Sequence, residues 1–359
     1  MFFNTLKMAL TAVLFCLCAG NLTAQEAKKA EKGGIGSPLV KKIIEGLQKQ
    51  ESPNIDKAIS DLEAGLKTSP KDREAELLLI QLYETSGMRA AQEDEKKAAP
   101  YFLKAATALR TLLKSDKLSG PQEKLIAEMV FYNEACVQAK AGKSDEAMQS
   151  LKDCFAAGVD NVSMLSTDKD LDSLRKRDDF KAMVKELTVK AAVEAKKEFA
   201  EMIASQKTFK FDFDLKDLDG KKVKLADFKG KYLIVDIWGT WCPPCRAEIP
   251  HFIEVLDKYK SKGLEIIGIN YEGGDDEKEA IDTIKKFNKT MKVPYNCVIG
   301  DEKTQKQVPD FQGYPTTLFL DRSGKVRMTI VGGQPLYRLE AAVEALMDSD
   351  KAASEKAGE

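Results

Sequence analysis

The sequence is poor in histidine, and its charges nearly cancel. His251 is the single histidine among 359 residues, and the formal net charge is −1 at pH 7. One imidazole is too few for a histidine-rich metal site, and this scarcity argues against Ser-His or Cys-His catalysis. A net charge this small gives no bulk electrostatic attraction to nucleic acid or to an anionic membrane. We therefore expect no nucleic-acid partner.

Long apolar runs are also missing, except at the start of the chain. Met8 to Ala19 is an apolar run of 12 residues, and it follows the positive charge of Lys7. The run is short for a membrane span, which needs about 20 apolar residues, and its length is typical of a secretory signal. We predict a signal peptide over residues 1–24, with small residues near its end as cleavage points. In the alternative, the segment stays uncleaved and anchors the protein in a membrane.

Cysteine is too sparse to build the fold. The chain has seven cysteines, and loss of the signal would remove Cys16 and Cys18 and leave five. Five are too few for a disulfide-built scaffold. Among them, Cys136 and Cys154 lie in helical patterns and are either buried thiols or a structural disulfide. Export predicts an extracytoplasmic, oxidising compartment, the periplasm in a bacterium, where a redox dithiol needs an outside source of electrons or oxidant.

The first half of the chain has helical periodicity. With 43% hydrophobic and 31% charged residues, the chain should form about two globular domains. We predict a flexible spacer over residues 25–37, a helical domain over 38–187 and a polar linker helix over 188–206. Residues typical of a helix-pair repeat of about 34 residues recur in the helical domain. These are Ala58, Leu62, Gly65 and Pro70, then Ile80, Tyr83 and Gly87, then Tyr132, Ala135, Gly142, Ala147, Leu151 and Cys154.

This pattern resembles about three degenerate tetratricopeptide repeats, with an insertion at Gln92 to Ala99 before the helix Pro100 to Leu113. Each small residue would let two helices approach closely, and each glycine would allow the turn between them. Leu165 to Leu187 should close the repeats, with Phe180 sealing the last exposed face. The resemblance implies a groove for a protein or peptide partner. The alternative is a packed module that spaces or solubilises the other domain.

The second half is organised around residues 232–245, YLIVDIWGTWCPPC. The apolar run predicts a strand buried on both faces of a sheet. Pro243 and Pro244 suit the first turn of a helix, so Cys242 would lie at a helix N-terminus, which favours a thiolate. Cys-x-x-Cys at such a junction is typical of a redox dithiol. The alternatives are a closed structural disulfide or half of a zinc site.

Strands and helices alternate over residues 207–348. Phe209 to Leu215 alternates strictly and predicts a half-buried strand, and Asp219-Gly220 predicts a hairpin turn before KKVKL. The pattern predicts an α/β sheet, parallel near its centre and antiparallel at one edge, followed by a polar tail over 349–359. Strands are expected at 264–270, 295–299, 316–321 and 326–331, and helices at 243–260, 276–290 and 336–347.

Residues 206–348 resemble the TlpA/ResA class of thioredoxin-fold proteins. The hairpin before the first central strand, the WCPPC motif and the run Gly-Tyr-Pro-Thr-Thr that begins at Gly313 match this class in order and spacing. The resemblance implies an extracytoplasmic thiol–disulfide oxidoreductase, usually a reductant in a bacterial envelope. It also implies that Pro315 is cis and lies beside the dithiol, and that Pro250 kinks the helix that carries the dithiol.

The roles at the site follow from position and from the resemblance. Cys242 should attack a client disulfide, and Cys245, one helical turn on and more buried, should resolve the mixed disulfide. Asp236 lies in the apolar run, so it should be protonated or hydrogen-bonded, with a raised pKa. The resemblance to thioredoxin implies that Asp236 takes the proton of the resolving cysteine. The alternative is an aspartate solvated near the strand end.

Side chains around the motif receive separate predictions. Trp238 should lie in the core, His251 on a solvated helix face, and Cys297 in a strand as a buried apolar filler. His251 and Cys297 are the only plausible extra ligands for a zinc site, and we predict no metal. We expect client contacts from the side chains next to the dithiol, namely Trp241, Pro243, Pro244, Tyr314 and Thr316.

The predicted function is therefore thiol–disulfide exchange in the reducing direction. Its partners would be protein disulfide or dithiol clients and an upstream thiol electron donor, and the cysteine pair would need no cofactor. The competing hypothesis is a protein-interaction scaffold whose thioredoxin-like domain is a docking module. Peroxidase chemistry is disfavoured, because it wants Thr or Ser three residues before the nucleophile, where this chain has Gly239.

Overall fold

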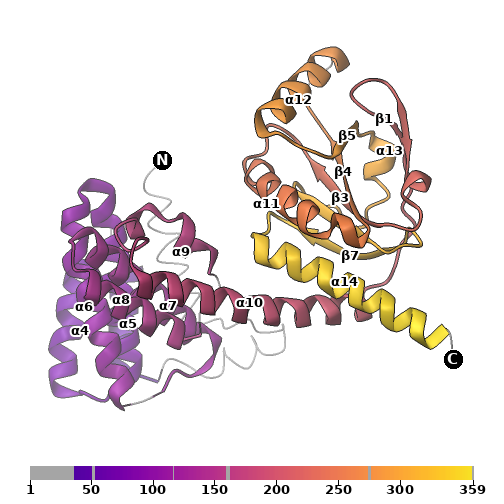
Figure 1. Cartoon of the computed structure of the whole chain (residues 1–359). Helices are drawn as coiled ribbons and strands as arrows, with labels where there is room; N and C mark the ends of the chain where they lie inside the picture. The colour runs from indigo at the N-terminus through magenta and orange to yellow at the C-terminus, as the bar shows by residue number, and fades with distance from the viewer. Residues whose placement is uncertain (1–35, 51–52, 116, 159–161, 274–275, 358–359) are drawn as a thin grey trace. The chain divides into compact units, whose positions relative to one another are not determined.

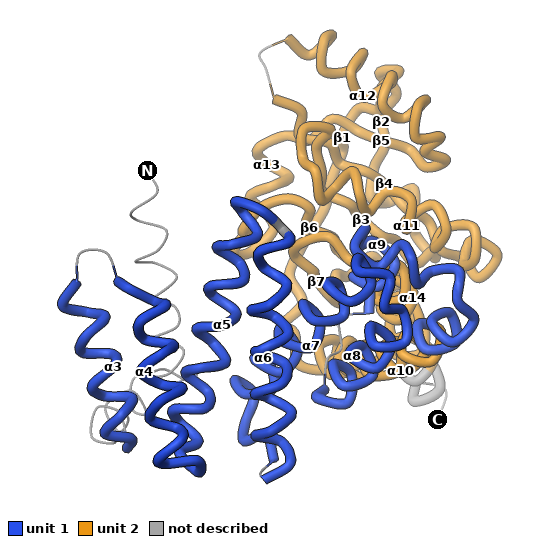
Figure 2. The backbone as a smooth tube through the Cα atoms, turned by 90° about the vertical axis from the view of Figure 1, so that its left-hand side faces the viewer, with its two compact units in different colours: residues 1–184 blue, residues 185–359 orange. Residues whose placement is uncertain are grey.

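The computed structural model describes residues 36–50, 53–115, 117–158, 162–273 and 276–357. The predicted signal peptide and almost all of the predicted spacer lie outside the described residues. The chain divides into two compact units, one ending at Val184 and the other beginning at Lys185 (Figure 2). Within the described ranges, no helix is both long enough and apolar enough to cross a membrane.

Unit 1 is built from helices whose starts are set by short polar side chains. Ser37, Asn54 and Asp72 each accept a hydrogen bond from a backbone N–H in the first turn of the helix that follows. From α3 to α8, each helix packs against the next, and η1 packs against α7 (Figure 1). In chain order they are α3 (Pro38–Gln48), α4 (Ile55–Thr68), α5 (Arg73–Glu93), α6 (Glu95–Ser115), α7 (Gly120–Lys140), α8 (Ser144–Ala156), α9 (Ser163–Thr167) and the 3₁₀ helix η1 (Lys169–Leu171).

The predicted insertion at Gln92 to Ala99 is wrong. Helices α5 and α6 are separated only by Asp94, and Pro100 lies inside α6 instead of starting it. The Asp94 carboxylate accepts a hydrogen bond from the Lys96 backbone N–H at 3.0 Å. This side chain therefore starts the helix upstream of the proline, and the proline removes one backbone donor without ending the helix.

The glycines of the helical pattern have two different roles. Gly142 has φ of 74° between α7 and α8, so it forms a turn as predicted. Gly65 and Gly87 instead lie inside α4 and α5, where an added Cβ would collide with Leu39 and with the ring of Phe102. These two glycines permit close helix packing, and the prediction that they form turns is wrong.

The end of the helical region is simpler than expected. Phe180 is buried, and helix α10 (Asp178–Ser205) runs without a break through the predicted boundary between closing segment and linker helix. Cys136 and Cys154 are free and buried, which selects the buried-thiol alternative. Burial raises the pKa of each thiol to about 12, so neither is a reactive thiolate near neutral pH.

A partly buried ionic network, centred on the buried Glu134, ties α6, α7 and α8 together. Arg110 on α6 donates to both carboxylate oxygens of Glu134 on α7, at 2.8 and 2.7 Å, and to Asp153 on α8 at 2.7 and 3.0 Å. Ser150 donates to the same Glu134 carboxylate at 2.7 Å. Glu134 is 5% exposed, so these donors take the place of water around its carboxyl group.

Unit 2 is built on a five-stranded sheet of order β5-β4-β3-β6-β7 (Figure 1). β3 pairs in parallel with β4, and β4 with β5, whereas β6 and β7 join in antiparallel pairs. The prediction of a sheet that is antiparallel at one edge is confirmed. The strands are β3 (Tyr232–Trp238), β4 (Leu264–Asn270), β5 (Asn296–Ile299), β6 (Thr316–Leu320) and β7 (Val326–Val331).

Helices cover one face of this sheet, and extended chain covers the other. Ile234 of β3 belongs to the core shared with the helices, whereas Leu233 and Val235 pack with apolar residues of the segment before the hairpin. All seven residues of β3 are buried, as its apolar run predicted. The remaining elements are β1 (Asp214–Lys216), β2 (Lys222–Lys224), η2 (Leu225–Phe228), α11 (Pro243–Tyr259), η3 (Lys260–Lys262), α12 (Glu277–Met291), α13 (Glu302–Gln305) and α14 (Leu336–Ala357).

At both ends of the α/β domain, the structure differs from the sequence-based prediction. The apolar residues of the first predicted strand alternate inward, but only Asp214–Lys216 forms a ladder. Upstream, the side chain of Gln307 replaces a strand partner. Its Oε1 accepts a hydrogen bond from the Asp212 backbone N–H at 2.9 Å, and its Nε2 donates to the Asp212 carbonyl at 2.8 Å. At the other end, α14 continues through the predicted polar tail to Ala357.

We predict that Arg110→Ala lowers the free energy of unfolding of the full chain by about 3 kcal/mol, because it leaves the buried Glu134 carboxylate without a positively charged partner. Urea denaturation followed by circular dichroism measures the change. The matched control is Arg89→Ala, which breaks an exposed ion pair with Asp56 at 3.6 Å and should cost less than about 1 kcal/mol. Equal losses in the two variants would contradict the importance of the ionic network.

Candidate functional site

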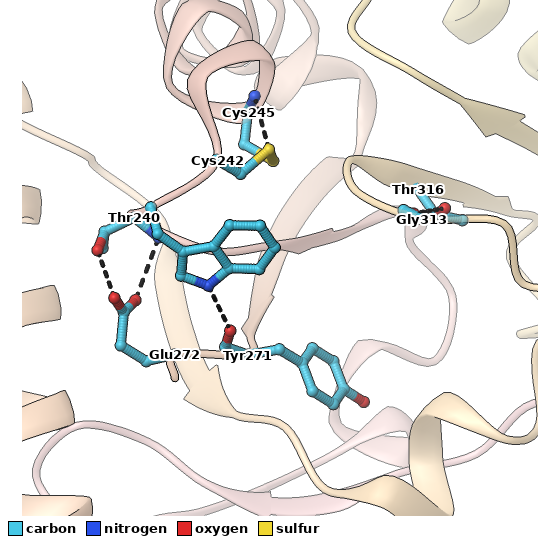
Figure 3. Close-up of a disulfide and its surroundings, with 8 residues drawn as sticks. Thr240, Cys242, Cys245, Tyr271, Glu272, Gly313 and Thr316 are labelled. Atoms are coloured by element: carbon cyan, nitrogen blue, oxygen red, sulfur yellow. Dashed lines mark hydrogen bonds between the residues drawn. A yellow bond between two sulfur atoms is a disulfide. The ribbon is translucent and has the colours of Figure 1, made fainter. Parts of the chain in front are cut away.

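The cysteine pair lies where β3 passes into α11. β3 ends at Trp238 and α11 begins at Pro243, so Cys242 is the N-cap residue of α11. Cys242 and Cys245 form a disulfide, and the Cys242 Sγ accepts a hydrogen bond from the Cys245 backbone N–H at 3.3 Å (Figure 3). Because a helix N-terminus favours negative charge, this position stabilises a thiolate on Cys242 when the pair is reduced.

Both cysteines are buried in the disulfide form. Cys242 is 3% exposed and Cys245 is 2% exposed, so the predicted difference in exposure is small. Trp241, by contrast, is 51% exposed, and Pro243 and Pro244 are exposed as well. The accessible surface next to the disulfide is therefore made by three of the side chains that were predicted to contact clients.

A second loop lies beside the first turn of α11. The Tyr314–Pro315 peptide bond is cis, as the resemblance implied. The Pro315 carbonyl accepts a hydrogen bond from the Gly332 backbone N–H at 2.8 Å. A Cβ on the neighbouring Gly333 would lie only 3.3 Å from the Pro244 carbonyl oxygen. The glycine pair after β7 thus brings the backbone close to both the cis-proline turn and the dithiol helix.

Two carboxyl groups are buried on the elements that carry the dithiol. Asp236 on β3 is 1% exposed, and burial, together with the nearby Glu248, raises its pKa well above the ordinary range. The solvated alternative for Asp236 is therefore wrong. Glu248 on α11 is 1% exposed, and burial raises its pKa to about 8, although the Gln334 backbone N–H donates to it at 2.9 Å. A carboxyl group that titrates near neutral pH is suited to proton transfer.

Glu248 is a site residue that the motifs did not reveal. It follows Cys245 by three residues, so the two side chains lie on the same face of α11. That spacing was the available signal. Because Asp236 and Glu248 interact electrostatically, their protons belong to a coupled pair. The chain therefore holds one buried carboxyl on the strand before the dithiol and another on the helix after it.

The register of the sheet places further polar side chains beside Asp236. Asp236 pairs with Thr317 on β6 and with Gly268 on β4, and Gly268 pairs with Cys297 on β5. Since Gly268 has no side chain, the Trp238 indole nitrogen and the Cys297 sulfur come within 2.8 and 3.1 Å of the position its Cβ would take. Cys297 is free and buried, and burial raises its pKa to about 12, as suits a buried filler.

Aromatic rings gather around the exposed side of the dithiol turn. The ring of Trp241 lies 5.2 Å from that of Tyr314 in a T-shaped arrangement. Tyr314 in turn lies 5.2 Å from Phe311 and 5.9 Å from Tyr271. The pairs of Tyr314 with Trp241 and with Phe311 are edge-to-face, an arrangement that adds stability beyond the buried area. The exposed indole therefore belongs to a packed cluster.

Two predicted surface side chains are less exposed than expected. Thr316 is fully buried, and its hydroxyl donates to the Gly313 carbonyl at 2.6 Å, so its side chain is withdrawn from the predicted client-contacting set. His251 is half-buried with its Nδ1 3.0 Å from the Gln334 carbonyl oxygen, so the predicted solvated position is wrong. Trp238 is fully buried, in the core as predicted. Across the described ranges, no cluster of three or more His, Cys, Asp or Glu residues could hold a metal ion.

Comparisons with known proteins identify relatives of the α/β unit. The AhpC/TSA family model matches residues 207–329. Thiol-disulfide oxidoreductase ResA of Bacillus thuringiensis subsp. konkukian (strain 97-27) is 40% identical over 133 residues, which is 36% of this chain and 71% of that protein. ResA of Bacillus subtilis (strain 168) is 31% identical over 121 residues, 34% of this chain and 64% of that protein.

A solved structure was found as well. The crystal structure of a thiol:disulfide interchange protein of the thioredoxin family from Chlorobium tepidum TLS has a TM-score of 0.35 and 28% identity, and the match covers 40% of this chain and 98% of that one. The sequence match to ResA covers more than two thirds of the Bacillus thuringiensis relative. The chain therefore belongs to the ResA family of thiol-disulfide oxidoreductases, with an all-helical region joined before its thioredoxin-fold domain.

Proposed function

We propose that this protein reduces disulfide bonds in protein clients outside the cytoplasm. The observation that carries the proposal is the Cys242–Cys245 pair at the N-terminus of α11, with buried carboxyl groups on the adjoining strand and helix. Kinship with ResA supports exchange between this pair and protein thiols or disulfides. The reducing direction is taken from the resemblance to envelope reductants and is part of the proposal.

The exchange proceeds in two steps, in which every proton and electron is accounted for. The Cys242 thiolate attacks one sulfur of the client disulfide, which forms a mixed disulfide and releases the first client sulfur as a thiolate that takes up a proton. Cys245 then gives up its proton and attacks the Cys242 sulfur. This step closes the Cys242–Cys245 disulfide and releases the second client sulfur. The client gains two electrons and two protons, and an upstream thiol donor must restore the dithiol.

The proton of Cys245 passes to the Asp236–Glu248 pair. Glu248 lies one turn beyond Cys245 on α11, and its pKa of about 8 lets it change protonation near neutral pH. One oxygen of each carboxyl, Asp236 Oδ1 and Glu248 Oε2, has no hydrogen-bond partner among the described residues. An acceptor oxygen is therefore available on both elements, and the pair can hold one proton between them.

Clients would dock on the exposed side chains beside the disulfide. Trp241 offers a half-exposed indole, and Pro243 and Pro244 present apolar rings that carry no backbone donor. Tyr314 packs its ring against Trp241 and precedes the cis bond. These four residues form the proposed client surface.

The helical unit is proposed to be tetratricopeptide-like and to bind a protein or peptide partner. A hollow of about 500 Å³ supports this role, because its wall offers both apolar and charged side chains to a partner. Its wall combines apolar and charged side chains of α6 and α7 with Asp168, the N-cap residue of η1. The side chains from α6 and α7 include Phe102, Tyr132, Val137, Lys96 and Lys140. Spacing or solubilising the oxidoreductase domain is the alternative role.

The location is proposed to be extracytoplasmic, the periplasm in a bacterium. The apolar run from Met8 to Ala19 after Lys7 supports export. If that segment is not cleaved, it would anchor the protein in the membrane. Either arrangement places the dithiol in an oxidising compartment, so the donor that reduces it must act there.

We predict that the full chain accelerates the reduction of insulin by dithiothreitol, as followed by turbidity. Cys242→Ser should return the rate to that of dithiothreitol alone, because it removes the attacking thiolate. Cys297→Ala is the matched control and should keep its activity, since that thiol is buried and lies outside the pair. An inactive wild-type protein with both thiols reduced would support the scaffold hypothesis instead.

The direction of electron flow has its own test. We predict a reduction potential nearer to about −270 mV, at the reducing end of known protein dithiols, than to about −120 mV, at the oxidising end. Equilibration with glutathione, read by alkylation of the free thiols, measures it. A value near the oxidising end would overturn the proposal that the protein acts as a reductant.

The buried carboxyls predict a specific pH dependence of stability. The pKa of Glu248 rises from 4.5 to about 8 on folding, so its contribution is fully present below pH 4.5 and is lost as the pH rises through 8. We expect the free energy of unfolding of the disulfide form to fall between pH 5 and pH 9, and to fall less in Glu248→Gln. Guanidinium denaturation at several pH values measures both curves.

The carboxyls also predict a change in rate. Asp236→Asn should slow the resolution of the mixed disulfide by about tenfold or more and shift its pH profile, because one proton acceptor is lost. Stopped-flow disulfide exchange across the pH range measures the effect. If the pH dependence of exchange in Asp236→Asn equals that of the wild type, Asp236 has no role in proton transfer.

A further inference from the structure

The turn at residues 239–241 connects β3 to Cys242. Glu272, which follows β4, holds this turn through hydrogen bonds. The Thr240 backbone N–H donates to one carboxylate oxygen of Glu272 at 3.1 Å. The Thr240 hydroxyl donates to the other oxygen at 2.6 Å. Figure 3 shows the two hydrogen bonds side by side. One carboxylate thus uses both oxygens to hold the residue two positions before Cys242.

The same strand end fixes the indole beside the dithiol. The Trp241 indole N–H donates to the Tyr271 carbonyl at 2.9 Å (Figure 3). The Tyr271 backbone N–H donates to the Trp238 carbonyl at 2.8 Å, which joins the ends of β4 and β3. An added Cβ on Gly239 would collide with the indole, so the ring lies directly over that glycine. Trp241 is exposed, yet its orientation is set by these contacts.

We propose that Glu272 is a positioning residue of the dithiol. Through Thr240 it fixes the turn that presents Cys242 and Trp241 to a client. Its negative charge also makes the Cys242 thiolate less favourable, which keeps the dithiol reducing. The proposal rests on the proposed role of Cys242 as nucleophile and adds a residue that lies outside every motif around it.

The sign of the charge effect follows from the two redox states. The disulfide carries no charge, whereas the reduced pair places negative charge on Cys242. The negative charge of the Glu272 carboxylate, which is hydrogen-bonded to Thr240, repels the thiolate and so destabilises only the reduced form. It therefore makes the dithiol a stronger reductant. Asp236 on β3 and Glu248 on α11 are buried, and their raised pKa values favour the neutral form. Burial also raises the pKa of the Tyr271 and Tyr314 phenols beside the turn, so both stay neutral. Arg246 is exposed next to Cys245, and the other charged or ionisable residues of α11, beginning at His251, follow Cys245 by six or more positions. Residues 313–315 and 332–334 add no charge.

Paired variants separate position from charge. Glu272→Gln removes the charge and leaves a single acceptor oxygen, whereas Thr240→Val removes the hydroxyl bond and keeps the charge. Thr240→Ser keeps the hydroxyl and is the control for Thr240→Val. Glu302→Gln is the control for Glu272→Gln, because it removes an exposed carboxylate of the same unit that is paired with Lys306.

Three quantities are measured on the full chain: the equilibrium constant with glutathione, the pH profile of Cys242 alkylation, and kcat/KM for insulin. Glu272→Gln should shift the equilibrium about threefold toward the reduced form, which corresponds to about 15 mV, and should move the alkylation profile to lower pH. Thr240→Val should lower kcat/KM about fivefold and leave the equilibrium constant unchanged. Thr240→Ser and Glu302→Gln should match the wild type in all three.

Two results would overturn the proposal. An unchanged equilibrium constant and alkylation profile in Glu272→Gln would remove the charge effect. Equal kcat/KM values for Thr240→Val and Thr240→Ser would remove the positioning role. Should Glu272→Gln fail to fold by circular dichroism, the two Thr240 variants still decide the positioning role. Loss of insulin reduction in every protein, wild type included, would instead contradict the proposed function.

Discussion

The burial of β3 is the constraint on which the α/β unit depends. All seven residues of this strand are buried, with helices packed on one face and extended chain on the other. Because β3 is paired along both edges, its end is fixed, and the chain must leave the sheet there to start α11. Cys242 therefore lies at a helix N-terminus, where unpaired backbone N–H groups favour a thiolate. The same burial removes Asp236 from water.

Two carboxyl groups beside the dithiol are buried away from water. An ionised carboxylate in this environment is costly, so Asp236 and Glu248 both favour the neutral form more than exposed acids do. They lie on different elements, one before the dithiol and one after it, and they interact. In the proposed mechanism, this pair accepts the proton of the Cys245 thiol. At the other side of the turn, Glu272 is half-buried and accepts two hydrogen bonds from Thr240.

Particular residues of the helical unit show what hydrophobic periodicity can predict and what it cannot. The spacing of apolar residues predicted helices, and helices are present, because burying one face of a helix needs side chains at that period. The same pattern did not separate Gly142, which forms a turn, from Gly65 and Gly87, which lie under neighbouring side chains inside helices. Nor did it predict that α6 starts before Pro100. The role of each glycine and the start of α6 depend on which side chains contact them in the folded protein.

The sequence by itself determined the division into a helical and an α/β half, the order of strands and helices, and the cysteine pair at a strand–helix junction. Each of these features depends on the spacing of residues along the chain, because helices and strands place side chains at fixed short intervals. Only the tertiary structure decided which distant groups serve that pair. Glu272 meets Thr240 across 32 residues, and Gln334 meets Glu248 across 86. Contacts over such separations come from sheet register and helix packing, and no local pattern records them.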